Sequence, residues 1–343
     1  MTTRIDKATL MVLSNRALAR AGLSPEHAET TSQVLVQGDM MGIPTHGVIR
    51  LTPYTERLKH GGVNPKAIPK IDQRAPSLCI VDGQNALGPV VANAALCQAI
   101  EMVKETGIAY VGCRSSNHLG AMVPYALQAC QAGFVMLSGT SASTTMPPWG
   151  GAEARIGNNP MCFAAACPKE PHIILDMAMS VAARGKIRGA QAAGQVIPEG
   201  WAVDKTGKPT TDASEALEGF LVAVGGHKGS GLSMAIDVLS GVLSGAKFLT
   251  GITSWVGNND TAQELGHFFI LIDPARLIGK ENYEAAMNEF CEIVHTTPAA
   301  DPVTPVILPG EREQTRIADA LAHGIELNVK VLEDVRRLAG EID

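Results

Sequence analysis

The chain has 343 residues, which is long enough for one large or two medium domains with ample core. Lysine and arginine number 28 against 34 acidic residues, so the formal net charge is -6, and no run of basic residues occurs. This balance argues against nucleic acid or an anionic membrane surface as the main partner. No apolar stretch reaches bilayer-spanning length, and the N-terminus lacks the unbroken apolar core of a signal peptide.

The cysteines indicate a reducing environment. Seven of them, at positions 79, 97, 113, 130, 162, 167 and 291, form neither a CxxC pair nor a metal-ligand spacing. A scattered, odd-numbered set inside apolar runs is typical of reduced, buried thiols. The histidines form no H-E-x-x-H pattern, and acidic residues are not paired at ligand spacing. These observations predict a cytoplasmic globular protein without a catalytic metal.

The N-terminal part of the chain predicts helices. Asp6–Ala21 carries apolar residues at helical spacing, and a second helix begins after Ser24 as cap, with Pro25 in its first turn. The proline-bearing stretch Val63–Pro76 predicts an extended linker between layers.

From Leu78 onward, short apolar strands alternate with small-residue helices, and helical character returns near the C-terminus. The predicted strands are Leu78–Val81, Ile108–Cys113, Phe134–Ser138, Met161–Ala166, Ile173–Leu175 and Phe268–Ile272. The predicted helices are Val90–Glu105, Ala121–Gln131, Val181–Ala193, Leu232–Leu243, Glu281–Val294, Arg312–Ala322 and Val329–Ala339. We therefore expect a mixed α/β protein. Residues 1–72 and 301–343 should form a helical unit that flanks a sheet domain of residues 73–300.

A T-H-G-x-x-R motif at Thr45–Arg50 is the first candidate site. Arg50 lies four residues beyond His46, so both side chains would share one face if the segment is helical. A guanidinium that grips a carboxylate would then lie beside a group that exchanges protons near neutral pH. Chemistry on a 2-oxo or 2-hydroxy acid needs that pair. Alternatively, Thr45 caps a helix and Arg50 is a solvated surface charge.

Two further candidates follow strands. His118 comes just after a predicted strand, where open α/β proteins tend to bind ligands, and is a candidate general acid/base. Alternatively, Ser116 or Asn117 caps a helix at 119–132 and His118 is merely exposed. Asp176 follows another predicted strand. It either orients an imidazole and assists proton transfer or serves as a helix N-cap.

A glycine-rich segment at 225–231 contains Lys228 and lies between an apolar stretch and a predicted helix. Its residue order matches neither Walker A nor the Rossmann fingerprint. It predicts either anion binding by backbone amides or tight helix–strand packing. The hydroxyl-rich loop 138–145 suits phosphate or ribose but is equally typical of an ordinary loop. The amide of Asn159 is either structural or a cofactor ligand.

Taken together, these segments resemble the malate/L-lactate dehydrogenase-like family, also called sulfolactate dehydrogenase-like. It includes ureidoglycolate dehydrogenase, diketogulonate reductase and a cyclic-imine carboxylate reductase. The resemblance covers nearly the whole chain. Its segments occur in the expected order: T-H-G-x-x-R at 45–50, Asn117-His118-x-Gly120, Trp149-Gly150-Gly151, Gly157-x-Asn159-Pro160, Asp176-Met177-Ala178, Trp201-Ala202-Val203-Asp204, Gly226-His227-Lys228-Gly229 and Pro309-Gly310-Glu311.

The resemblance implies a homodimer that binds NAD, with NADP as the other possibility, in a non-Rossmann sheet domain. It implies that the active site lies in a cleft between the sheet domain and the helical unit. His46, His118 and Asp176 are the implied catalytic residues, and Arg50 and Thr45 the implied substrate-binding ones. The implied cofactor-binding residues are Ser141, Ser143, Asn159, Asp176, Met177, Ala178, His227, Lys228, Gly229, Pro309, Gly310 and Glu311. Ala142 stands where a ureidoglycolate-type member has a cofactor-binding serine.

The expected activity is NAD(P)-dependent interconversion of a small 2-hydroxy acid and its 2-oxo acid. In this scheme Arg50 fixes the carboxylate, and His46 or His118 transfers the proton with the support of Asp176. Two alternatives remain: reduction of a cyclic imine carboxylate, and non-redox nucleotide binding through the glycine-rich segment.

Overall fold

A mixed sheet of seven strands forms the centre of the computed structural model, which describes residues 1–342. Its strand order is β2-β3-β4-β13-β5-β8-β9. Only β3 and β4 are parallel among these neighbours, and helix α4 connects them. The other neighbouring pairs are antiparallel. The strands are β2 (Lys70–Ala75), β3 (Leu78–Asp82), β4 (Ile108–Ser116), β5 (Val135–Thr140), β8 (Met161–Ala165), β9 (Ile173–Met177) and β13 (Leu265–Ile272).

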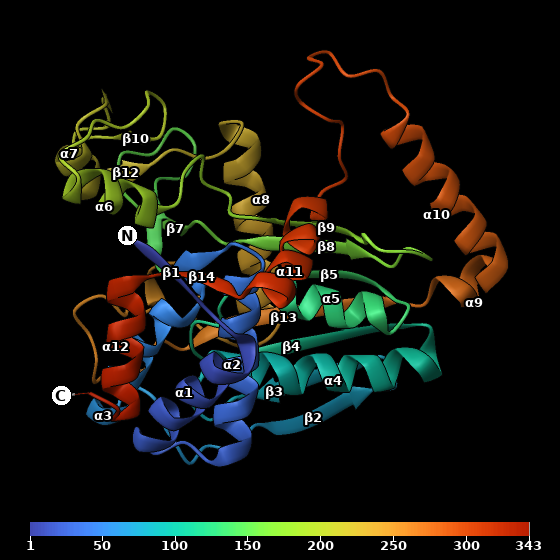
Figure 1. Ribbon diagram of the computed structural model, residues 1–343, viewed down its shortest axis with the longest axis horizontal. Helices are drawn as coiled ribbons and strands as arrows, with labels where there is room; N and C mark the ends of the chain where they lie inside the picture. Colours follow the sequence, from blue (N-terminus) through green and yellow to red (C-terminus); the bar gives the residue numbers. More distant parts are fainter. Residues whose placement is uncertain (343) are drawn as a thin grey trace.

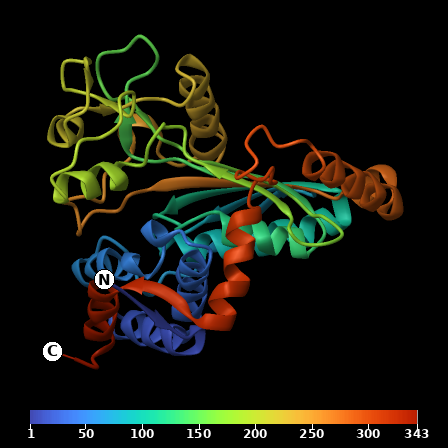
Figure 2. The ribbon, with the colours of Figure 1, turned by 45° about the horizontal axis from the view of Figure 1, so that its top comes forward.

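The central strand β13 shows why both faces of this sheet are covered. Successive side chains of a strand point to opposite faces. Phe269 and Leu271 belong to the main hydrophobic core, whereas Phe268 belongs to a second core cluster. Helices α4 (Gly88–Thr106) and α5 (Val123–Gln131) cover the first face, and α8 (His227–Asp237) covers the other (Figure 2).

The two ends of the chain lie together beside this sheet (Figure 1). Strand β1 (Thr2–Ile5) pairs with β14 (Ile325–Asn328) in antiparallel register. Helices α1 (Lys7–Arg20) and α3 (Leu51–His60) pack against α12 (Val329–Ala339) near this pair, and α2 (Pro25–Met40) packs against α1 and β14. Helix α11 (Glu311–His323) connects back toward α2.

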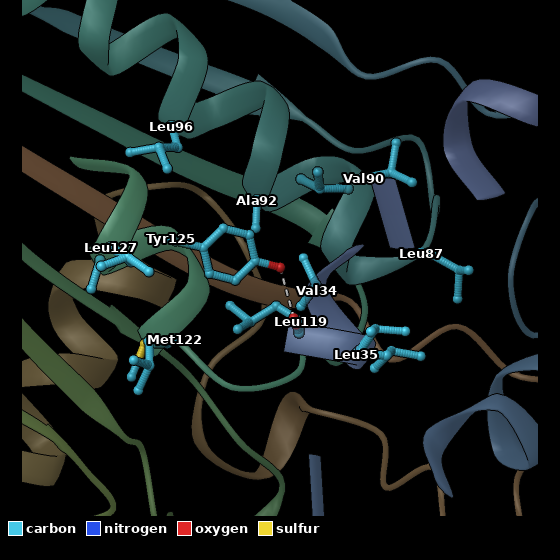
Figure 3. Packing of buried hydrophobic residues seen from close by; sticks show 14 of the residues in the cluster. Val34, Leu35, Leu87, Val90, Ala92, Leu96, Leu119, Met122, Tyr125 and Leu127 are labelled. Carbon is cyan, nitrogen blue, oxygen red and sulfur yellow. Dashed lines mark hydrogen bonds between the residues drawn. The ribbon is translucent and has the colours of Figure 1, made fainter. Parts of the chain in front are cut away.

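One continuous hydrophobic core joins the helical unit to the sheet. Val34 and Leu35 of α2 belong to the same hydrophobic cluster as Leu96 of α4 and Tyr125 of α5 (Figure 3). The Tyr125 hydroxyl donates a hydrogen bond to the backbone oxygen of Leu119 at 2.8 Å. The two units therefore hold each other in place through apolar contact. The expected division at residues 72 and 300 stays a prediction.

A smaller lobe lies on the α8 side of the sheet. It contains the three-stranded sheet β11-β10-β12 and the strand pair β6–β7. Its elements are β6 (Thr144–Met146), β7 (Ile156–Gly157), α6 (Arg184–Ala192), β10 (Ala202–Val203), β11 (Pro209–Thr210), α7 (Ala213–Glu218) and β12 (Phe220–Leu221). Helices α9 (Pro274–Ile278) and α10 (Lys280–His295) project from the opposite end of the molecule as an arm (Figure 1).

The mixed α/β class and the non-Rossmann sheet are confirmed. Each predicted strand is present within a few residues, and α12 has the predicted bounds. The linker prediction for Val63–Pro76 is wrong in part, because β2 lies inside it and pairs with β3 as an edge strand. Helix α8 begins at His227, five residues before the predicted start, since Gly225 and Gly226 take positive φ angles and end the preceding turn. No helix among residues 1–342 is long and apolar enough to cross a membrane.

Candidate functional site

The T-H-G-x-x-R segment folds as two short 3₁₀ turns, Pro44–His46 and Val48–Arg50, with extended backbone at Gly47 between them. The expectation of one helical face for His46 and Arg50 is therefore wrong. Asp39, at the end of α2, causes the break: its carboxylate accepts a hydrogen bond from the Val48 amide at 2.7 Å. A Cβ atom at Gly47 would lie 2.0 Å from that carboxylate, so only glycine fits.

The side chain of Arg50 is nevertheless held in place by two contacts. Its Nε donates a hydrogen bond to the backbone oxygen of Thr45 at 2.6 Å. Its guanidinium carbon lies 5.1 Å from the ring centroid of Trp255, within cation–π range. The alternative of a solvated surface charge is therefore wrong for Arg50, whose side chain is partly buried.

Three rings stack beside Arg50. The His46 and His118 centroids lie 5.4 Å apart with an interplanar angle of 18°, and those of His118 and Trp255 lie 4.7 Å apart at 17°. His46 and His118 lie 72 positions apart along the chain, and His118 and Trp255 lie 137 apart, so the fold alone brings these rings together. Tyr54 of α3 meets His118 edge-on, with centroids 6.1 Å apart. The two histidines that the sequence left as competing proton donors therefore occupy one site.

The ring of His118 is fixed by hydrogen bonds at Nδ1. The Tyr54 hydroxyl lies 2.8 Å from this atom, and the Gly120 amide donates to it at 3.3 Å. Because a backbone amide can only donate, Nδ1 is the acceptor, and we assign the neutral ring's proton to Nε2.

Asn117 does not cap a helix. Its side chain is buried and bonds to Asn85, Ala86 and Arg57, and α5 begins only at Val123. Ser116 is likewise buried, and its hydroxyl lies 2.7 Å from Nε2 of His267. The alternative in which one of these residues caps a helix while His118 is exposed is therefore wrong.

Both stacked histidines are held neutral. Burial, followed by the charge of Arg50, lowers the pKa of His46 to about 4. Burial and the same guanidinium lower the pKa of His118 well below its ordinary value. A bound carboxylate would offset the charge of Arg50 and thus raise both pKa values. Binding of an anionic substrate is thereby coupled to the ability of this site to take up a proton.

Asp176 lies within β9, opposite Cys162 of β8, instead of following the strand. Its carboxylate accepts a hydrogen bond from the Met122 amide at 3.0 Å, immediately before α5. Asp176 is thus an N-terminal anion for α5, not the cap of a helix that follows it in sequence. Burial raises the pKa of Asp176 to about 6, against the lowering effect of the Met122 and Val123 amides. A carboxyl with this pKa exchanges a proton near neutral pH.

A cavity of 420 Å³ brings several predicted residues together. It lies between the T-H-G-x-x-R turns, β9 and the turn before α11. Of the residues named from sequence, it is lined by Thr45, His46, Asp176, Met177, Ala178, Pro309 and Gly310. Glu311, next along the chain, instead accepts hydrogen bonds from the Leu308 amide and pairs with His295. His46 belongs both to this cavity and to the ring stack.

The glycine-rich segment presents bare backbone at the start of α8. Gly225 and Gly226 have φ angles of 61° and 63°, and a Cβ at Gly226 would lie 3.1 Å from the ring of Trp149. His227 and Lys228 are exposed in the first turn of an eleven-residue helix. This geometry suits an anionic group of a nucleotide. The packing interpretation also has support at Gly229, where a Cβ would lie 2.1 Å from the Val224 oxygen.

Two residues of the predicted cofactor set have engaged side chains. Asn159 is fully buried; its oxygen accepts from the Ala142 amide and its NH₂ donates to the Ser233 oxygen. The Ser141 hydroxyl exchanges hydrogen bonds with the backbone of Gly266. Both side chains thus tie the loop after β5 to its neighbours, whereas Ser143 is partly exposed.

Sequence reasoning missed Tyr54, Arg57 and Trp255. Tyr54 lies four residues after Arg50, so helical spacing offered a signal. Arg57 carried no such signal, because an arginine in an amphipathic helix is usually solvated, yet it is 1% exposed. Trp255 lies in a loop about 200 residues from Arg50, where no spacing rule applies. Within residues 1–342, no cluster of three or more His, Cys, Asp or Glu side chains could hold a metal ion.

The chain is similar to known proteins over nearly its whole length. Residues 5–336 match the family model described as malate/L-lactate dehydrogenase. Ureidoglycolate dehydrogenase (NAD(+)) from Escherichia coli K12 is 35% identical over 324 residues, which cover 94% of this chain and 92% of that protein.

Solved structures of similar proteins extend the likeness to the fold. Sulfolactate dehydrogenase from Methanocaldococcus jannaschii superposes with a TM-score of 0.91 at 33% identity, covering 99% of this chain and 97% of that one. Delta1-piperideine-2-carboxylate reductase from Pseudomonas syringae pathovar tomato superposes with a TM-score of 0.90 at 28% identity. The superposition covers 98% of this chain and 99% of that one. The chain therefore belongs to the malate/L-lactate dehydrogenase family.

Proposed function

We propose that this protein is an NAD(P)-dependent oxidoreductase that interconverts a small 2-hydroxy acid and its 2-oxo acid. The observation that carries this proposal is the placement of Arg50 beside the stacked rings of His46 and His118. Family membership supports the activity, and the NAD(+) in the name of the Escherichia coli relative favours NAD as cofactor. Malate, lactate, sulfolactate and ureidoglycolate share the 2-hydroxy acid group that this arrangement suits.

Arg50 anchors the substrate carboxylate through its planar fork. The adjacent C2 oxygen then lies within the region of the two imidazoles. In the oxidation direction, the hydroxyl proton passes to a neutral histidine. In reduction, the same histidine returns a proton to the carbonyl oxygen. The low pKa of both free rings keeps them able to accept this proton, while the bound carboxylate stabilises the imidazolium that results.

The residues present fit a nicotinamide cofactor across two regions. The bare backbone at Gly225–Gly229 and Lys228 would hold a phosphate group, and Met177, Ala178 and Pro309, which line the 420 Å³ cavity, would contact another part of the cofactor. When bound, the cofactor exchanges a hydride with C2 of the substrate. Asp176 holds or releases a proton in the wall of the cavity that His46 also lines.

A second candidate is the reduction of a cyclic imine carboxylate. The similarity to the Pseudomonas syringae reductase over nearly the whole of both chains favours it. Arg50 would hold the carboxylate of either substrate. A panel of 2-oxo acids and cyclic imines, assayed with NADH and NADPH by nicotinamide absorbance, separates the two activities. Family membership argues against the non-redox nucleotide-binding alternative.

Substitution of Arg50 tests the carboxylate anchor. Because a lysine is a point charge and cannot reproduce the bidentate fork, Arg50→Lys should lower kcat/KM for the 2-oxo acid by about 100-fold. The KM for NADH should stay within about twofold, because the contacts of the Arg50 side chain are with Thr45 and Trp255 and not with the glycine-rich segment proposed to hold the cofactor. Unchanged kinetics for the 2-oxo acid would contradict this role.

The proton donor is identified by comparing His46→Gln and His118→Gln in both reaction directions. Loss of the pH dependence of kcat in one variant identifies the transferring ring. The other ring then acts by stacking, and its variant should retain the wild-type pH profile at reduced rate. Full turnover in both variants would overturn the scheme.

The arm formed by α9 and α10 supports a homodimer. No residue of α10 is buried, and Leu277, Phe290 and Ile293 expose large apolar surfaces. Such a surface is typical of a covered interface. Phe290→Asp should therefore convert a dimer into a monomer in sedimentation velocity. The thiol state of all seven cysteines is consistent with a cytoplasmic location.

A further inference from the structure

Trp255 lies at the centre of the contacts that surround the proposed site, yet no motif contains it. It belongs to the loop between the short turn Leu249–Gly251 and β13. Its ring lies 4.7 Å from that of His118, 5.1 Å from the Arg50 guanidinium carbon and 6.2 Å from the ring of Tyr54. One side chain thus contacts both the proposed carboxylate anchor and one proposed proton carrier.

The loop that carries Trp255 is fastened from inside by Arg57. The buried guanidinium donates hydrogen bonds to the backbone oxygens of Asn258 at 2.5 Å and Thr261 at 2.8 Å. It also donates to Asn117, the residue before His118, at 3.2 Å. Hydrogen bonds from a charged donor are stronger than neutral ones. Arg57 therefore fixes the Trp255 loop and the His118 turn relative to each other.

Packing alone does not require this arrangement. Trp255 is only partly buried and lies at the margin of the main core. A ring that merely filled space would not need a parallel stack on a histidine together with a cation over its face. A guanidinium over an indole is attracted by the ring quadrupole, and indole is the strongest such partner among side chains.

We propose that Trp255 is a positioning residue for the reaction: its indole orients the Arg50 guanidinium and the His118 ring toward the substrate. This inference rests on the proposed function of Arg50 and His118. It assigns the loop of residues 252–263 to the substrate site and predicts that substrate binding, not cofactor binding, depends on the indole. Removal of the indole leaves the bond to the Thr45 oxygen as the one hydrogen bond that fixes the Arg50 side chain within residues 1–342.

The test compares Trp255→Leu, which removes the aromatic face, with Trp255→Phe, which keeps a smaller one. Trp255→Leu should raise the KM for the 2-oxo acid about tenfold, the size of a desolvated cation–π contact. It should also shift the pH profile of kcat, while the KM for NADH stays unchanged. Trp255→Phe should recover most of the loss. Trp201→Leu is the matched control, because Lys186 lies 6.0 Å from that ring in the smaller lobe; it should behave as wild type.

A binding measurement separates this inference from the proposed function. Oxamate, an unreactive analogue of a 2-oxo acid, should change tryptophan emission in the wild type and in Trp201→Leu but not in Trp255→Phe. If this change occurs without turnover of any 2-oxo acid or imine, the proposed function fails and the placement of Trp255 stands. Wild-type KM and pH profile in Trp255→Leu would overturn the inference. An equal rise in the KM for NADH would also overturn it, because that indicates general damage.

Discussion

The two regions that carry the proposed chemistry are built in opposite ways. Around Arg50, side chains are interlocked: Arg57 fastens a loop, Asp39 fixes a turn, and three rings stack. At the start of α8, by contrast, Gly225 and Gly226 leave backbone exposed beside solvated side chains.

This difference follows from what each region would bind. A reacting carbon must be held within a fraction of an ångström, which requires side chains whose own positions are fixed. A phosphate group needs only amides and a favourable dipole, which a glycine turn provides with few supporting contacts. We therefore expect substitutions in the first region to act on geometry and those in the second to act on charge.

The largest effect is expected from Gly47→Ala in the interlocked region. The added Cβ would lie 2.0 Å from the Asp39 carboxylate, which is buried and bonded to the Val48 amide. The turn must shift, and a displacement of Arg50 by about 1 Å should reduce kcat/KM about 100-fold. Steady-state kinetics with the 2-oxo acid measure this loss.

Gly189→Ala in α6 is the control for the Gly47→Ala variant. Apart from its chain neighbours and the backbone of its own helix, no described atom lies within 4 Å of the Cβ position there, so helix propensity predicts slightly higher stability and unchanged kinetics. Equal kinetics in the two variants would show that the Asp39 contact does not fix the turn.

The same contrast explains what the sequence could reveal. Regular elements such as α12 were predictable because apolar periodicity and an Asn328 cap are local signals. Arg50 was found through its motif, but its orientation was not, because the carboxylate that breaks the helix belongs to α2. Trp255 and Arg57 could not be found, since their partners lie in loops distant in sequence. Edge strand β2 was missed because it lacks an alternating apolar pattern.

A smaller effect is expected from the ionisation of Asp39. Burial raises the pKa of its carboxyl to about 7, from an ordinary value of 3.8. Between pH 3.8 and about 7, the Asp39 carboxyl is therefore protonated in the folded protein but already ionised in the unfolded chain. The contribution of Asp39 to stability is fully present below pH 3.8 and is lost as the pH rises through about 7.

Asp39→Asn isolates this contribution. The amide oxygen can still accept from Val48, but it cannot ionise. Between pH 5 and about 8, the free energy of unfolding of the wild type should fall by about 2 kcal/mol relative to that of Asp39→Asn, the usual cost of an uncompensated buried group. Urea titrations at several pH values measure this difference. Parallel pH dependence in both proteins would contradict the assignment.

The smallest effect is expected at Lys228, in the region of exposed backbone. Lys228→Met removes a solvated charge from the first turn of α8 and should raise the KM for NADH about fivefold, because one exposed charge contributes about 1 kcal/mol. The effect should decrease at high salt, since exposed charges are screened. The KM for the 2-oxo acid and the melting temperature should not change. Lys186→Met, which alters a charge in the smaller lobe, is the control. If Lys228→Met instead lowers stability and leaves the KM for NADH unchanged, the glycine-rich segment serves packing, as the close approach of Gly229 to Val224 would then indicate.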